Sequence, residues 1–314
     1  MRVAARCAHS ASGEAFADNE GDGDMPRTYS ELYISVRNRL RDAGIEAAEL
    51  EGKLIVATAA GKTTEKLLRD MRFYATDEVE RRVDSMLRRR LAGEPVAYLI
   101  GEWEFYGLGL DISPAVLIPR PDTEVLVQTV VHELDSGADC RVLDLCAGSG
   151  CIGLALKHFL PQSSIVLADI SENALIVAQK NSRRLGLDTE IVKCDLLPGY
   201  KNRFKDSEFD IIVSNPPYIK STDMDFLQRE VKHEPRIALD GGEDGMKFYR
   251  ALALLWEGAL KPHGEMILEA GYDTSRGIYS LFAECGYSEI TTRRDLGGIV
   301  RLVAAKRGSG YENN

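Results

Sequence analysis

From Arg141 to the end of the chain, short apolar runs with strand character alternate with segments of helical periodicity. The apolar runs are RVLDL, IVLAD, EIVKCD, FDIIVS, GEMILEA and two final runs near 287–292 and 299–305. Repeated strand–helix units predict a parallel sheet with helices on both faces. No helical pattern separates the last two runs, so we expect the final strand to be antiparallel. Residues 119–307 therefore predict an α/β domain with a mostly parallel sheet.

Residues 26–93 have a different pattern, which predicts a small helical domain. Thr28 and Glu31 have the spacing of a capping box at the start of a first helix. Further helices are predicted at about 46–60, at about 64–74 and from Thr76 to Gly93. The runs Arg81-Arg82 and Arg88-Arg89-Arg90 indicate either a solvated face or a docking surface for an acidic or RNA-bound partner.

Between these domains, residues 94–118 contain Gly, Pro and aromatic residues in the short alternating runs AYLIG and EFYGLGLDI. This pattern predicts a β-hairpin linker. Residues 1–25 are small, polar and acidic, which predicts a disordered extension and leaves Met25 as an alternative start. Residues 308–314 are expected to be a flexible tail.

Composition excludes several classes of protein. The net charge of −10 argues against electrostatic binding of nucleic acid by the protein as a whole. No apolar run approaches the ~18 residues of a membrane span, and the N-terminus lacks the apolar region of a secretory signal. The six cysteines show no C-x-x-C pair, so we expect reduced thiols, no metal site and a cytoplasmic location.

A glycine-rich turn after the first strand of the α/β domain predicts a cofactor site, because ligands bind beyond the carboxyl ends of parallel strands. The predicted cofactor-binding residues of this first segment are Asp144, Cys146, Ala147, Gly148, Ser149 and Gly150. Asp169 ends the second strand, where a carboxylate can accept hydrogen bonds from ribose hydroxyls. Asp195 ends the third strand, where adenine would lie.

Two cofactors fit this pattern. The sequence from Gly148 to Gly153 matches G-x-G-x-x-G, and Asp169 is correctly placed for NAD. S-adenosylmethionine uses the same architecture without a pyrophosphate and favours an acid at the end of the first strand. Asp144 fits that role indirectly, or it braces the glycine turn.

The fourth strand distinguishes the two cofactors, because it ends in Asn215-Pro216-Pro217-Tyr218. Two prolines predict a stiff loop with outward carbonyls. Asn215 adds an amide that donates and accepts, and Tyr218 adds a flat π-face. Such a loop suits a planar group with N–H donors, for which a methyltransferase has a use and a dehydrogenase has none. A simple turn that ends a strand is the plainer interpretation.

Four segments together resemble the HemK/PrmC family: LIPRPDTEVLV, VLDLCAGSGCIGLAL, SNPPYI and EPRIALDGGEDG. The similarity extends from about Thr28 to Lys306. It implies a Rossmann-like class I methyltransferase fold with a seven-stranded sheet and an N-terminal helical domain that engages the substrate. The implied reaction is S-adenosylmethionine-dependent methylation of the glutamine N5 in the Gly-Gly-Gln motif of peptide-chain release factors, by an enzyme expected to be a monomer.

The resemblance also implies roles for the loop. The Asn215 side-chain oxygen and the Pro216 carbonyl would accept the two N–H groups of the glutamine amide, and Tyr218 would pack on its plane. Asn215, Pro216 and Tyr218 are thus the expected catalytic residues, Pro217 completes the substrate site, and Asn215 also borders the cofactor. Cys146 and Leu196 depart from the family pattern: Cys146 stands at a common glycine and Leu196 at a position where some members have an aromatic.

Three alternatives remain open from the sequence. The loop with the glycine turn would also fit an amino-methyltransferase that acts on DNA or RNA. An NAD-dependent oxidoreductase is a second alternative, and a methyltransferase fold kept only as a binding scaffold is a third.

Overall fold

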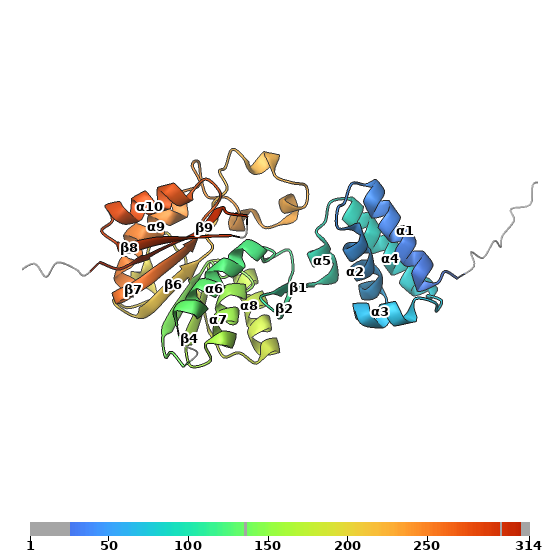
Figure 1. Ribbon diagram of the computed structural model, residues 1–314, viewed down its shortest axis with the longest axis horizontal. Helices are drawn as coiled ribbons and strands as arrows, with labels where there is room; N and C mark the ends of the chain where they lie inside the picture. Colours follow the sequence, from blue (N-terminus) through green and yellow to red (C-terminus); the bar gives the residue numbers. More distant parts are fainter. Residues whose placement is uncertain (1–25, 135–136, 296, 309–314) are drawn as a thin grey trace, which may run out of the picture.

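The computed structural model describes residues 26–134, 137–295 and 297–308. The predictions for residues 1–25 and for most of the tail at 308–314 therefore lie outside the described residues. A bundle of helices lies at one end of the molecule and a sheet covered by helices at the other (Figure 1). No helix among the described residues is long and apolar enough to cross a membrane.

The bundle contains α1 (Tyr29–Asp42), α2 (Ala48–Ala59), α3 (Thr64–Asp70), α4 (Asp77–Leu91) and α5 (Val96–Ile100). The predicted capping box is present, because Thr28 and Glu31 exchange hydrogen bonds between side chain and backbone. The amphipathic faces of these helices enclose a core of their own, separate from that of the sheet. Burial of this core is what lets helices of five to fifteen residues persist.

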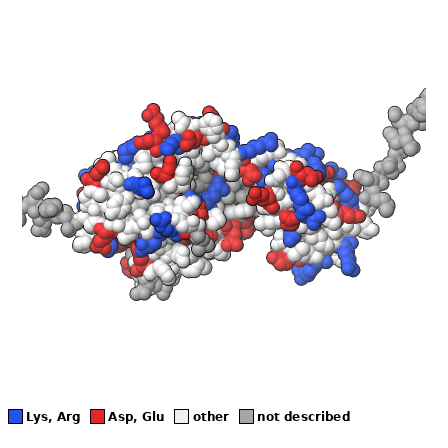
Figure 2. Space-filling view, turned by 45° about the horizontal axis from the view of Figure 1, so that its top comes forward, with Lys and Arg blue, Asp and Glu red and all other residues white. Residues whose placement is uncertain are grey.

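The arginines of α4 divide into two kinds. Arg81, Arg82, Arg88 and Arg89 are exposed on the helical region, where Figure 2 shows basic and acidic side chains interspersed. Arg90 is only 3% exposed. A solvated face is thus the wrong interpretation for Arg90, because the helical period places it inward, in line with Val83 and Leu87.

Arg90 joins the two halves of the chain. Its guanidinium bonds both carboxylate oxygens of the buried Glu51, with Nε to Oε2 at 2.6 Å and Nη2 to Oε1 at 3.1 Å. Its Nη2 also donates to Glu230, which belongs to the α/β half, at 2.5 Å. Next to it, Arg229 packs so closely on Gly93 that a Cβ built there would lie 2.7 Å from the arginine Cγ. The end of α4 is therefore fixed to the segment around Glu230.

The linker contains less strand than the sequence pattern predicted. Strands β1 (Glu102–Phe105) and β2 (Leu108–Asp111) form an antiparallel hairpin. The run AYLIG, however, lies in α5, which starts after Pro95 and ends at Gly101 in the left-handed conformation, with φ 76°. A short apolar run has no periodicity that separates strand from buried helix, and here burial against the bundle decides for helix.

The larger half is built on a seven-stranded sheet of β3 (Arg141–Leu145), β4 (Ser164–Asp169), β5 (Glu190–Lys193), β6 (Phe209–Ser214), β7 (Leu260–Glu269), β8 (Ser288–Arg294) and β9 (Val300–Lys306). Their order is β5-β4-β3-β6-β7-β9-β8. Strands β3 to β7 pair in parallel, and β9 is antiparallel to both of its neighbours. This arrangement confirms the predicted mostly parallel sheet and its antiparallel final strand.

Helices cover both faces of this sheet, as α/β architecture requires. These are α6 (Glu124–Glu133), α7 (Cys151–Phe159), α8 (Glu172–Leu185), α9 (Lys247–Leu255) and α10 (Ser275–Glu284). Short 3-10 turns are η1 (Pro121–Thr123), η2 (Tyr200–Asn202), η3 (Met224–Phe226), η4 (Val231–His233), η5 (Arg236–Ala238) and η6 (Glu257–Ala259). Helix α9 thus ends at Leu255, and the separate turn η6 follows it before β7.

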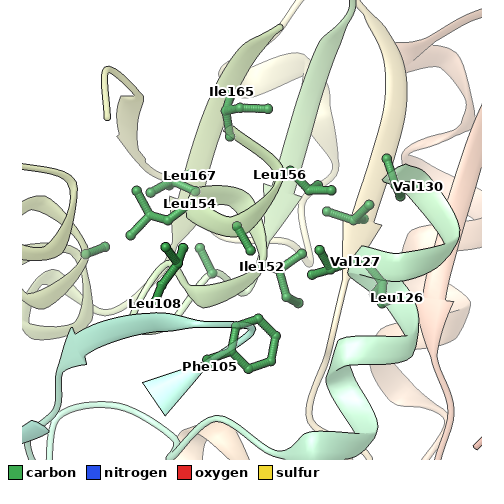
Figure 3. Close-up of a cluster of buried hydrophobic side chains, with 14 of the residues drawn as sticks. Phe105, Leu108, Leu126, Val127, Val130, Ile152, Leu154, Leu156, Ile165 and Leu167 are labelled. Carbon is green, nitrogen blue, oxygen red and sulfur yellow. The ribbon is translucent and has the colours of Figure 1, made fainter. Parts of the chain in front are cut away.

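Alternate residues of each strand supply the two cores. On β3, Val142 belongs to the core under α6, α7, α8 and the hairpin, and Leu143 belongs to the core under α9 and α10. Figure 3 shows the first of these cores, where Phe105 and Leu108 of the hairpin reach the side chains of α6 and α7. The hairpin is therefore packed onto the sheet domain and is no free linker.

We predict that Arg90→Met destabilises the protein by about 3–5 kcal/mol, because it leaves the carboxylate of Glu51 buried without its partner. Arg88→Met, on the exposed face of the same helix, should stay within about 0.5 kcal/mol of the wild type. Urea unfolding followed by circular dichroism measures both. Equal stability of the two variants would show that the buried ion pair does not hold the helices together.

Candidate active site

A cavity of about 260 Å³ lies at the carboxyl ends of the parallel strands. The loops after β3, β4, β5 and β6 converge on it, as they do in open α/β sheets that bind ligands. The predicted cofactor residues that line it are Cys146, Ala147, Gly148, Ser149, Asp169, Asp195, Leu196 and Asn215. Asp144 and Gly150 do not line it.

The turn after β3 depends on left-handed backbone. Gly148 has φ 56° and Gly150 has φ 80°. A Cβ built on Gly150 would come 3.1 Å from Leu154 and Leu167, whereas one built on Gly148 would meet nothing within 4 Å. Gly150 thus closes the turn against the core, and Gly148 leaves its backbone open to a ligand.

Cys146 also has a positive φ, of 60°. A residue other than glycine costs about 1–2 kcal/mol in this conformation. This conformation accounts for glycine as the common family residue here. Burial raises the pKa of the Cys146 thiol, so the side chain stays neutral.

Asp144 is completely buried beneath the turn. Its Oδ2 accepts a hydrogen bond of 2.9 Å from the backbone N–H of Gly153, at the start of α7. Burial raises the pKa of Asp144 to about 7. Of the two roles that the sequence left open, the contacts match the brace. Oδ1 of Asp144 and Oγ of Ser149 are buried polar atoms that no described group bonds.

Asp169 stands at the end of β4 and faces the cavity. Its Oδ2 accepts a 2.9 Å hydrogen bond from the backbone of Gly148, and its Oδ1 accepts a 2.8 Å bond from the backbone of Ser171. Burial raises the pKa of this carboxyl, and the two N–H donors oppose the rise. Each oxygen keeps a second lone pair, so a ribose hydroxyl fits without loss of these bonds.

The loop after β5 forms the next wall. Asp195 is exposed, and its side chain accepts a 3.0 Å bond from the backbone of Leu197. Leu196 is buried, and its carbonyl accepts a 2.9 Å bond from the indole of Trp256. This wall thus combines an exposed acceptor with apolar surface, which suits a nucleobase.

The sequence analysis missed residues that close the cavity from the opposite side, among them Ile237 and Phe248. Ile237 is 55% exposed although it is large and apolar. Ile237 belongs to the segment between β6 and α9, which extends from the sheet toward the helical bundle (Figure 1), and Phe248 belongs to the first turn of α9. Ile237 lies in EPRIALDGGEDG, one of the four segments that resemble the family. That segment has no strand or helix pattern from which its position over the cavity could be predicted.

The loop Asn215-Pro216-Pro217-Tyr218 is held by the strand-like segment 239–241. Ile219 donates to the Leu239 carbonyl at 2.9 Å, and Gly241 donates to the Ile219 carbonyl at 2.7 Å. A Cβ on Gly241 would lie 2.6 Å from the Tyr218 Cα, so the two backbones meet where only glycine fits. The loop is therefore fixed on both sides.

Within this loop, Tyr218 is half-buried and packs on Gly271, where an added Cβ would come 2.9 Å from its ring. Burial raises the pKa of Tyr218 to about 12, so its hydroxyl is neutral. Asn215 donates from Nδ2 to the hydroxyl oxygen of Thr123 at 3.3 Å. No described residue donates a hydrogen bond to the Pro216 carbonyl.

A second cavity, of about 540 Å³, lies on the other side of the same loop. It is lined by Tyr218, by Leu117 and Ile118 from the segment after the hairpin, and by the segment from Leu227 to Leu239. Four residues line both cavities: Leu117, Arg120, Asn215 and Ala238. Asn215 therefore stands where a group in one cavity would meet a group in the other.

Glu234 fixes the wall that separates these cavities, a role that was not predicted from the sequence. It is 5% exposed, accepts a 3.0 Å bond from the backbone of Ile118 and pairs with Arg120. The segment before α6 and the segment after β6 are thus bound to each other.

Two family models match the chain. The PrmC N-terminal domain covers residues 31–101, and the methyltransferase small domain covers residues 121–244. A methyltransferase from Pyrococcus furiosus has a similar structure, with a TM-score of 0.50 at 18% identity over 72% of this chain and 99% of that one. The seven-stranded sheet is thus that of a class I methyltransferase.

Relatives that match at greater sequence identity carry the name release factor glutamine methyltransferase. The protein from Caulobacter vibrioides is 37% identical over 89% of this chain and 96% of its own. The protein from Agrobacterium fabrum is 37% identical over 91% of this chain and 99% of its own. The protein from Bordetella pertussis is 38% identical over 85% of this chain and 97% of its own. With such identity over nearly the whole of each relative, the chain belongs to the release factor glutamine methyltransferase family.

Proposed function

We propose that this enzyme transfers a methyl group from S-adenosylmethionine to the side-chain amide nitrogen, N5, of the glutamine in the Gly-Gly-Gln motif of peptide-chain release factors. The observation that carries the proposal is the position of Asn215 at the junction of two cavities. One cavity suits the cofactor and the other suits a side chain that enters from the protein surface. The names of the relatives support the substrate.

The cofactor site uses the chain's own polar groups in three places. Asp169 would hold the ribose hydroxyls, and the wall of Asp195 and Leu196 would hold adenine. The glycine turn around Gly148 would border the amino-acid part, above the unbonded oxygens of Asp144 and Ser149. The cofactor supplies an electrophilic methyl group on a sulfonium.

The chemical difficulty lies in the substrate, because an amide lone pair is delocalised into the carbonyl. The Asn215 Oδ1 and the Pro216 carbonyl would accept the two N–H groups of the glutamine. Both acceptors bind more strongly as positive charge develops on the nitrogen, so they favour the transition state over the ground state. Tyr218 would contact the plane of the amide, and the rigid loop supplies orientation.

The helical bundle provides the larger contact with the release factor in this proposal. Its exposed arginines on α4 suit an acidic surface, and the Arg90–Glu230 bond connects the bundle to the segment that lines the substrate cavity. We propose a monomeric enzyme that acts in the cytoplasm, where translation takes place, without direct contact to nucleic acid. The net charge of −10 agrees with the last point.

Family membership does not favour the nucleic-acid methyltransferase or the oxidoreductase. The direct test is incubation with methyl-labelled S-adenosylmethionine and a purified release factor, followed by mass spectrometry of the Gly-Gly-Gln peptide. We expect one methyl group on the glutamine, and none on a factor in which asparagine replaces that glutamine. Label on RNA in a cell lysate, with none on release factors, would contradict the proposal.

Asp169→Ala is predicted to raise the cofactor Kd about ten- to a hundredfold. Loss of a hydrogen bond to a charged group is worth about 1.5–3 kcal/mol, and the ribose hydroxyls would lose their acceptor. Isothermal titration calorimetry with S-adenosylmethionine measures the change. An unaltered Kd would remove Asp169 from the cofactor site.

Asn215→Ala should lower the rate of methyl transfer by about 10²–10³, by analogy with the loss of one preorganised stabilising group. The Kd of the cofactor should change far less. Asn215→Asp should be nearly as inactive, because the structure shows that the amide also donates, to Thr123. Single-turnover methylation at saturating cofactor measures both variants, and near-normal turnover of Asn215→Ala would leave the loop as a structural turn.

Charge reversal on the bundle tests the docking role. The double variant Arg81→Glu/Arg88→Glu should raise the KM for an intact release factor and leave the KM for a short Gly-Gly-Gln peptide unchanged. Arg183→Glu, on an exposed face of α8, is the matched control. Equal effects on protein and peptide substrates would argue against docking through α4.

A further inference from the structure

Glu269 is a buried carboxylate beside the reactive loop, and the mechanism above leaves it without a role. It is the last residue of β7 and is 3% exposed. Its Oε2 has no hydrogen-bond partner among the described residues. Burial raises the pKa of Glu269 to about 7, and hydrogen bonding from the side chains of Thr123 and Asn215 opposes that rise. Ser214 of β6 pairs with Leu268 of β7 in parallel register, so the residues that follow them, Asn215 and Glu269, are also neighbours.

The charged and titratable groups around Glu269 come from several elements. Asp122 of η1 raises its pKa and Arg301 of β9 lowers it. These two form an ion pair with each other at 2.8 Å, so their effects partly cancel. The remaining neighbours whose titration Glu269 affects are Tyr218, Tyr249 and Cys151. All three have raised pKa values and stay neutral near pH 7. Glu269 is therefore the member of this group that titrates there, and Asp144, beneath the glycine turn, is a separate carboxyl with a pKa of about 7.

The order of donors and acceptors around Glu269 decides which way Asn215 faces. An ionised carboxylate only accepts, so a Thr123 hydroxyl that faces Glu269 directs its single proton to the carboxylate. The Thr123 oxygen is then left to accept, and it accepts from Nδ2 of Asn215 at 3.3 Å. With its NH₂ group directed to Thr123, Asn215 has an Oδ1 to which no described residue donates. That is the orientation needed to accept an N–H from a substrate amide.

We propose that Glu269 is a positioning residue that, through Thr123, holds the Asn215 amide with its oxygen toward the substrate. This inference rests on the proposed function and adds a residue to it. Protonation of Glu269 reverses the order of donors. The acid then donates to Thr123, and the Thr123 hydroxyl is free to donate to Asn215. In an inverted Asn215 amide, the N–H donors of Asn215 face the N–H donors of the glutamine, and neither has an acceptor. The rate of methyl transfer therefore falls.

The pH dependence of methyl transfer tests this directly. Activity requires the deprotonated carboxyl, so the single-turnover rate should rise about tenfold between pH 6 and pH 8 as Glu269 ionises with a pKa near 7. Glu269→Gln should lower the rate at pH 8 about tenfold and remove the acid limb, because glutamine does not titrate. The KM for the peptide should change less than kcat does.

Thr123 offers a matched pair of variants. Thr123→Ser keeps the hydroxyl and should retain the rate and the pH profile. Thr123→Val keeps the shape but removes the hydroxyl, and it should lose activity to about the level of Glu269→Gln. Equal activity of the serine and valine variants would overturn the proposal, as would an acid limb that persists unchanged in Glu269→Gln.

A second readout does not depend on activity. A carboxyl whose folded pKa is raised contributes stability below its unfolded pKa and loses it as pH rises through the folded value. The melting temperature of Glu269→Gln relative to the wild type should therefore increase between pH 5 and pH 8, and no such increase would show that Glu269 does not titrate in this range. A wild type that fails to methylate the peptide at any pH would refute the proposed function itself, whereas a methylating wild type with no acid limb would refute only the role of Glu269.

Discussion

The close approach of the Asn215–Tyr218 loop to a glycine-containing segment, residues 241–245, fixes the centre of this molecule. Gly241 and Gly245 lie against the backbone of Tyr218, at positions where an added Cβ would come within 2.6 Å of Cα and 2.5 Å of the carbonyl oxygen. These contacts bind the loop after β6 to the segment before α9. The prolines make the loop stiff, and the glycines determine where it lies. Both cavities have this loop as a shared wall, so their relative position depends on it.

The two halves of the chain communicate through the segment that follows the loop. Glu230 bonds Arg90 of the helical bundle, and Glu234, four residues later, pairs with Arg120 at the border of both cavities. Ile237 of the same segment lines the cofactor cavity. A release factor bound to the bundle would thus contact an element continuous with the reaction site. The buried Arg90–Glu51 pair gives that element a fixed anchor.

Much of the fold could be predicted because its signals are local. Strand runs, the glycine turn and the capping box of Thr28 and Glu31 each follow from a few adjacent residues. The AYLIG helix was mispredicted because five apolar residues carry no distinguishing period, and its helical form depends on packing against the bundle. The burial of Arg90 depends on Glu51 and Glu230, which are 39 and 140 residues away, so a run of arginines looked uniformly exposed.

The residues of the candidate site likewise divide into those that local sequence patterns reveal and those that only the tertiary structure brings together. Asp169 and the glycine turn follow strand ends and were found from the sequence. Thr123, Glu234 and Glu269 come from three different segments, and only tertiary structure brings them to the Asn215 loop. The role of Asp144 illustrates the limit further, because a strand-end acid has the same sequence pattern whether it faces a ligand or a backbone N–H.

The central claim is that Asn215 joins a cofactor in one cavity to a glutamine in the other. The most direct measurement is a crystal structure of the enzyme with S-adenosylhomocysteine and a Gly-Gly-Gln peptide. We expect the glutamine amide nitrogen within hydrogen-bond distance of both the Asn215 side-chain oxygen and the Pro216 carbonyl, with its lone pair directed toward the sulfur. A glutamine bound away from this loop, by an enzyme preparation that methylates the same peptide once S-adenosylmethionine is supplied, would contradict it.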